Sequence, residues 1–93
     1  MLPKNVLTLE VDVDKEKYNL NELKNEIESI IIDFIDEKKV KFKKKDLSPK
    51  RDALLFSFII DEEKTNNGYL EKKIGDIENV KSVEVVDVKR IAG

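Results

Sequence analysis

The side chains of this chain that could do chemistry are cations and carboxylates. Of its 93 residues, 18 are Lys or Arg and 20 are Asp or Glu, whereas Cys and His are absent. Without them the chain has no thiolate nucleophile, no imidazole base and none of the usual zinc ligand sets. No histidine is present to activate a serine, and no glycine-rich phosphate loop occurs. We expect a protein that is not an enzyme and that carries no cofactor and no metal site.

The strongest concentration of charge is basic. Eight Lys and Arg residues lie between Lys38 and Arg51 against the single carboxylate of Asp46, so this segment carries +7 in a chain of net charge −2. Such a segment is typical of docking onto an acidic protein surface or a phosphate backbone. It is equally typical of a solvated edge strand, because lysines there oppose pairing with other chains. The candidates for docking are Lys41, Lys43, Lys50 and Arg51.

A second basic feature is the pair Lys89 and Arg90, which ends the alternating segment that starts at Val80. Two cations at the end of a terminal edge strand are free to project from the body of a domain. On spacing alone, a solubilising strand end is the simpler interpretation.

Hydrophobic alternation predicts four strands, of which the last has a mixed pattern that indicates a bulge or a strong twist. Between the second and third strands, residues Asp46–Asp52 with Pro49 are predicted to form a turn or loop. In the third strand Phe56 and Phe58 belong to the buried face. The predicted strands are Val6–Val13, Lys39–Lys45, Ala53–Asp61 and Val80–Ile91.

Apolar residues three and four apart predict two helices. The first begins after Asn19, where Glu22 stands three residues later as in a capping box, and ends near residues 36–38. The second is shorter, contains Leu70, Ile74 and Ile77, and is followed by Asn79, a residue suited to the left-handed position that ends many helices.

The order strand, helix, strand, strand, helix, strand predicts one ferredoxin-like α+β domain over residues 1–93, a four-stranded antiparallel sheet with both helices on one face. The first and third strands would be central. Because Phe56 and Phe58 would be buried, the sheet lacks exposed aromatic side chains for stacking bases, and direct nucleic-acid binding there is not expected. No apolar run is long enough to span a membrane, and the first residues lack the order of a secretory signal, so we expect a cytoplasmic protein.

The carboxyl-terminal segment Ile77–Ile91 resembles the ending of archaeal elongation factor 1-beta, which runs Ile-Glu-Gly-Val, a Ser-Val-Glu-Val-like strand, Asp-Val, a basic residue and an aliphatic one. The helix start Asn19–Lys24 is similar to the Asp-Leu-x-x-Leu-Lys of that family, and Asp61–Glu63 precedes the second helix as it does there. The resemblance covers residues 6–91 and is most specific over the last fifteen.

The resemblance implies a ferredoxin-like exchange factor for elongation factor 1-alpha, the GTPase that delivers aminoacyl-tRNA. Such a protein distorts the phosphate and Mg²⁺ end of the nucleotide pocket and makes no covalent bond. In eukaryotic relatives a lysine second from the carboxyl end approaches the magnesium site. The matching position here is Arg90, with Lys89 beside it. A cation there competes with Mg²⁺ for the same negative charge.

One stretch departs from the family. A Pro-x-x-Phe-Gly-Leu motif usually enters the third strand, and its Phe contributes to the partner contact. Aligned on Pro49, this chain has Asp52 and Ala53 in place of Phe-Gly. No partner contact is carried over to that position. The alternative prediction is a small ferredoxin-like regulatory module that binds a ligand, or RNA through the segment Lys38–Arg51, without catalytic activity.

Overall fold

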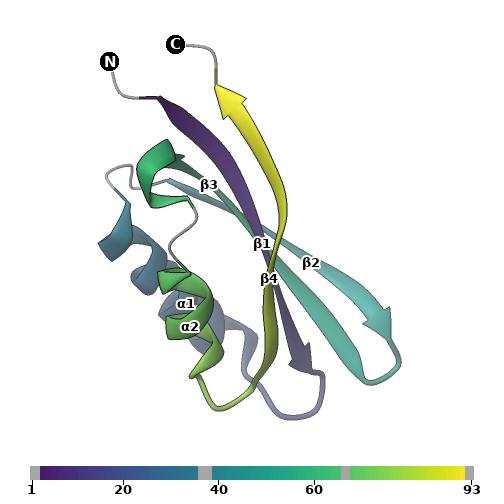
Figure 1. Cartoon of the computed structure of the whole chain (residues 1–93). Coiled ribbons are helices and arrows are strands. Elements are labelled where there is room, and N and C mark those ends of the chain that lie inside the picture. Colours follow the sequence, from purple (N-terminus) through teal and green to yellow (C-terminus); the bar gives the residue numbers. More distant parts are fainter. Residues whose placement is uncertain (1–2, 36–38, 66–67, 92–93) are drawn as a thin grey trace.

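The structure is a computed structural model that describes residues 3–35, 39–65 and 68–91. The described residues form a sheet of order β2-β3-β1-β4, in which all neighbours are antiparallel. Both helices lie on one side of this sheet (Figure 1). These observations confirm the predicted ferredoxin-like α+β fold, with the first and third strands in the centre. The elements are β1 (Lys4–Asp14), α1 (Leu20–Phe34), β2 (Val40–Ser48), β3 (Arg51–Asp61), the 3-10 turn η1 (Glu62–Lys64), α2 (Tyr69–Gly75) and β4 (Val80–Ile91).

The core lies between the helices and the central strands. Every second residue of β1 is buried, from Leu7 to Val13, and Phe56 of β3 is completely inaccessible to solvent. From α1 the residues Leu23, Ile27 and Ile31 pack onto this face, at the spacing of one helical stripe. Phe56 and Phe58 are therefore core residues, as predicted, and neither is exposed for base stacking.

The start of α1 is capped as the sequence predicts. The Asn19 side chain accepts a hydrogen bond from the Glu22 amide at 3.1 Å, which satisfies one of the free donors of the first turn. The last residue of α1 is Phe34, and the predicted end at residues 36–38 lies outside the described residues. Lys38, the first residue of the basic segment, also lies outside them.

The end of α2 differs from the prediction. The helix stops at Gly75, and Asn79 does not adopt a left-handed conformation. The chain instead leaves the helix through two tight turns, in which the Ile77 amide donates to the Ile74 carbonyl and the Val80 amide donates to the Ile77 carbonyl, both at 3.1 Å. These hydrogen bonds pair the amides of Ile77 and Val80 with carbonyls of the same turns, so the end of the helix does not require a residue in the left-handed conformation.

The predicted turn or loop over residues Asp46–Asp52 is present but shorter than predicted. Strand β2 continues to Ser48, β3 begins at Arg51, and only Pro49 and Lys50 form the turn. Asp46 and Asp52 are directly opposite each other across the hairpin. Two carboxylates in such a pair oppose strand formation, but Lys15, just after β1, and Lys44 of β2 lie close enough to neutralise them, as described below.

The predicted irregularity of β4 is a pair of bulges. Between the pairs Leu9–Val85 and Thr8–Asp87 the extra residue Val86 has no counterpart on β1, and a second shift near the start of β4 leaves out Lys81. A bulge residue changes which face the following side chains occupy. Val88 consequently lies opposite Leu7, on the same face as Val85.

The sheet face that α1 and α2 leave uncovered is called the open face below. Residues of β2 on this face are the lysines Lys41, Lys43 and Lys45, whereas β1 and β4 contribute the neighbouring carboxylates of Glu10 and Glu84. Between them Ser57 of β3 and Thr8 of β1 share a hydrogen bond of 2.8 Å. The open face is therefore basic along its β2 edge and acidic over Glu84 and Asp87 of β4, beyond which Lys89 lies near the end of that strand.

Glu10 is the residue of the open face whose ionisation affects stability. Partial burial, with Asp12 and Glu84 nearby, raises the pKa of Glu10 above its ordinary value of 4.5. The pKa of Glu10 is therefore higher in the folded state than in the unfolded state. At pH values above the folded-state pKa, the ionised carboxylate lowers the free energy of unfolding. At pH values below the unfolded-state pKa this loss of stability is absent. Glu10→Gln is expected to raise the free energy of unfolding at pH 7 by roughly 0.2–1 kcal/mol. In urea denaturation this gain should disappear below pH 4; an equal gain at both pH values would contradict the assignment.

Candidate partner-binding site

The two cations predicted from the sequence lie at the end of the edge strand β4. Lys89 is opposite Val6 of β1 and Arg90 is opposite Asn5, so they occupy opposite faces of the sheet. Lys89 is on the open face, and Arg90 is on the face of the helices. Their side chains are 76% and 70% exposed. A protein surface that approaches this strand end can therefore meet both cations, one on each side of the strand.

Each of these cations has one carboxylate within reach. Lys89 Nζ is 3.9 Å from Asp87 Oδ2, and Arg90 Nη2 is 3.7 Å from Glu62 Oε2 of η1. Exposed ion pairs of this kind contribute about 0–1 kcal/mol. Both cations can consequently leave their carboxylates for a more strongly charged anion at little cost.

Apolar side chains accompany the cations, and the sequence analysis missed them. Three residues in the second half of β4 have large exposed fractions, which are 47% for Val86, 45% for Val88 and 37% for Ile91. This part of the sheet, where β1 begins and β4 ends, extends beyond α1 and α2 (Figure 1). The break in alternation at Val85–Val86 was the available signal. A strand end that carries both cations and exposed valines suits contact with another protein.

The other predicted site residues lie elsewhere. Lys41 and Lys43 are on β2, the opposite edge of the sheet from β4. Lys50 and Arg51 are at the β2–β3 turn, and Arg51 pairs with Asp14 at the end of β1 farthest from Arg90. Four strands are about 14 Å across. The structure therefore separates the predicted cations into a β4 end and a β2 hairpin, which cannot act as one small site.

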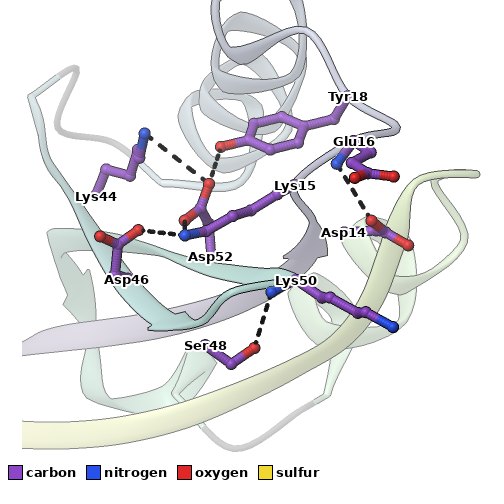
Figure 2. Close-up of polar contacts among 9 residues, drawn as sticks. All are labelled: Asp14, Lys15, Glu16, Tyr18, Lys44, Asp46, Ser48, Lys50 and Asp52. Carbon is purple, nitrogen blue, oxygen red and sulfur yellow. Dashed lines mark hydrogen bonds and ion pairs between the residues drawn. The ribbon is translucent and has the colours of Figure 1, made fainter.

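A buried carboxylate, Asp52, organises the end of the molecule at the β2–β3 hairpin (Figure 2). Its side chain is 4% exposed and accepts a hydrogen bond of 2.8 Å from the Tyr18 hydroxyl. Lys15 Nζ lies 3.6 Å away and Lys44 Nζ 3.9 Å away. The sequence analysis placed Asp52 in a turn or loop, because nothing in the pattern around it showed that Lys15, just after β1, and Lys44 of β2 would surround it.

The same group includes the partly exposed pair of Lys15 and Asp46, whose Nζ and Oδ1 atoms are 2.8 Å apart. The hydrogen bond to Lys15 lowers the pKa of Asp46, and the hydrogen bond to Asp46 raises the pKa of Lys15. Burial and the neighbouring Asp52 raise the pKa of Tyr18 to about 12, so its hydroxyl stays protonated and keeps donating. Together these contacts attach the segment after β1 to the hairpin.

Asp52 is the residue that an alignment on Pro49 matches to the Phe of the Pro-x-x-Phe-Gly-Leu motif, which the resemblance in the sequence led us to look for. Because its side chain points inward and is nearly inaccessible, it cannot contact a partner directly. At this position the chain has a polar structural group.

A hollow between the two helices, lined by described residues, does not resemble a ligand pocket. It has a volume of about 380 Å³ and lies between the start of α1 and the end of α2, and its lining includes Glu22, Glu26, Asp76 and Glu78. Small-molecule pockets are mostly apolar with few polar groups. Among the described residues, no three carboxylates gather as a metal ligand set would, and no helix has the length and apolar character to cross a membrane.

The fold and the exposed strand end together define a small α+β module that presents two cations and exposed valines at the end of its edge strand β4. In a comparison with family models, residues 6–91 match the EF-1 guanine nucleotide exchange domain. The chain belongs to this family, which assigns it to nucleotide exchange in translation elongation and to an EF-1α-type GTPase as its general kind of partner. No individual curated protein matches the chain.

Proposed function

We propose that this protein is an archaeal-type elongation factor 1-beta, which promotes GDP release and GTP loading of elongation factor 1-alpha in the cytoplasm and is not itself an enzyme. The match to the family supports the exchange function. The observation that carries the proposal further is the exposed end of β4, where Lys89 and Arg90 project on both sides of one strand.

The chemistry of the strand end suits the phosphate and Mg²⁺ end of a nucleotide pocket. A guanidinium or ammonium group brought near the metal repels Mg²⁺ and attracts the same oxygens that hold it. Weaker Mg²⁺ binding loosens the hold on the GDP phosphates. Arg90 presents a planar group with several donors, whereas Lys89 presents a compact charge, so the two are not interchangeable.

The exposed valines of β4 give the strand end a second means of contact. Val86 and Val88 precede the cations along the strand and are nearly half exposed. Apolar contact at a docking surface adds affinity that salt does not screen. Binding of the GTPase should therefore weaken with salt but persist.

The test is release of fluorescent GDP from an archaeal elongation factor 1-alpha, followed after adding excess unlabelled GDP with and without this protein. We expect a catalytic amount of the protein to accelerate release, and an unrelated small GTPase treated in the same way to show no acceleration. If no archaeal elongation factor 1-alpha responds at any protein concentration, the proposed partner is wrong.

A further inference from the structure

The open face carries a charge pattern that the strand end does not use. In one row across the sheet, Lys41 of β2 and Asp87 of β4 stand at the two edges, joined by the pairs Lys41–Ser57, Ser57–Thr8 and Thr8–Asp87. The next row follows the same order, with Lys43 at one edge and Glu84 at the other.

Two lysines on the β2 edge of this face lack an acidic partner. Lys41 and Lys43 form no ion pair with any described residue, and both are exposed. At the β4 edge, Asp87 has Lys89 of the same face 3.9 Å away, whereas Glu84 is directly opposite Glu10 of β1, which is an unfavourable pair of like charges. The lysines of β2 and the carboxylates of β4 are about 14 Å apart across the strands.

Two-fold symmetry turns this pattern into a complementary one. When a second copy faces the sheet about an axis parallel to the strands, β2 of each copy lies over β4 of the other, and every row keeps its level. Lys41 then meets Asp87 of the second copy, and Lys43 meets Glu84. An axis perpendicular to the strands places β2 over β2 and lysine against lysine, so that arrangement is repulsive. We propose that the open face binds a second copy of this chain in the first orientation.

The centre of the face fits the same arrangement. Strand β3 of one copy lies over β1 of the other, so half-buried Ile59 faces Val6, and Thr8 faces Ser57. Face-to-face sheets stack about 10 Å apart and rotate by about 30°, which shifts the edge strands by a few ångströms only. Lysine side chains are long and flexible enough to follow that shift.

A nucleic acid is disfavoured on this face, although its lysines alone would attract one. Glu10, Glu84 and Asp87 lie on the same surface and repel a phosphate backbone. Arg90 lies on the other face of β4, so a dimer through the open face leaves it exposed. The inference does not rest on the proposed exchange function, but Lys89 lies on the open face, so a second copy bound there comes close to that cation.

The test is the mass of the full chain in solution, measured by sedimentation equilibrium over a wide range of protein concentrations at low and high salt. We expect a dimer that weakens as salt is added. Two charge-reversal variants, Lys41→Glu/Lys43→Glu and Glu84→Lys/Asp87→Lys, should each lower the dimer affinity by at least about tenfold, since like charges then meet. Mixed in equal amounts, the two variants should form a dimer again, because their faces are complementary.

The control is Lys72→Glu/Lys73→Glu on α2, which changes the net charge equally but lies off the open face and should leave dimerisation unchanged. Circular dichroism confirms that each variant is folded; if either reversal unfolds the chain, Lys43→Gln and Glu84→Gln replace them and should still weaken the dimer. A wild-type chain that stays monomeric at all concentrations overturns the proposal, as does a mixture that fails to restore the dimer. A monomer that binds labelled RNA and loses it in Lys41→Glu/Lys43→Glu also overturns it.

Discussion

Replacing Lys89 and Arg90 together by alanine is expected to abolish the acceleration of GDP release from elongation factor 1-alpha. A hydrogen bond to a charged group is worth about 1.5–3 kcal/mol, so loss of Arg90 alone should slow exchange at least about tenfold. The two cations are on opposite faces of β4. The single variants, measured by the same fluorescent GDP assay, should therefore differ, and the larger loss identifies the face of the strand that enters the nucleotide pocket.

The matched control for this experiment is Lys72→Ala/Lys73→Ala, which removes two exposed cations from the last turn of α2. It should leave the exchange rate within about twofold of wild type, because long-range attraction between exposed charges is screened. Lys41, Lys43, Lys50 and Arg51 provide a third comparison: their loss should affect association more at low salt than at high salt. A double variant at Lys89 and Arg90 that accelerates release normally would refute the role of the strand end.

Replacing Asp52 by alanine is expected to lower the free energy of unfolding by about 2 kcal/mol, from the loss of charge-assisted contacts and of the Tyr18 hydrogen bond. The carboxylate is 4% exposed, and three donors surround it. The loss stays below that of a fully buried ion pair because Lys44 and Lys15 are partly exposed and can be hydrated once released. Urea denaturation followed by circular dichroism measures the change.

Asp46→Ala is the control within the same cluster. Asp46 contacts the same Lys15, but its side chain is 76% exposed, so its loss should lower the free energy of unfolding much less than the loss of Asp52. Asp52→Asn should fall between the two, because an amide oxygen still accepts from the Tyr18 hydroxyl. Equal destabilisation by Asp46→Ala and Asp52→Ala would show that burial of Asp52 is not what makes it important.

The features predicted correctly from the sequence depend on neighbours along the chain. The alternation of β1, the Asn19 cap and the helical stripe of α1 each involve residues within a few positions, and their periods differ between helix and strand. The order of the elements then restricts the topology to a few choices, because crossovers are right-handed and strands pair with neighbours. The fold followed from these two steps.

The features that were missed depend on residues far apart in the chain. From its neighbours in the sequence, Asp52 is predicted to lie in a turn or loop. Its partners Lys15 and Tyr18 are 37 and 34 positions earlier in the chain, and only the folded structure brings them beside it. The division of the basic residues between two edges likewise appears only once the strand order is known. For the strand end, the resemblance directed attention to Arg90, but its partner Glu62 and the exposed Val88 come from the three-dimensional arrangement.

The bulge at Val86 decides which face of the sheet each later side chain of β4 occupies. The bulge takes Val86 out of the pairing with β1, so Asp87 pairs with Thr8, and Lys89 and Arg90 lie opposite Val6 and Asn5. If Val86 paired with Thr8 in a regular ladder instead, every later residue would shift by one position, which would turn Lys89 to the helices and Arg90 to the open face. Deleting Val86 would remove the bulge and leave both cations on their present faces. Two relatives of equal length, one with the bulge and one with a regular ladder, would thus present different cations to the same pocket. The position of the bulge therefore matters as much as the residues of the motif.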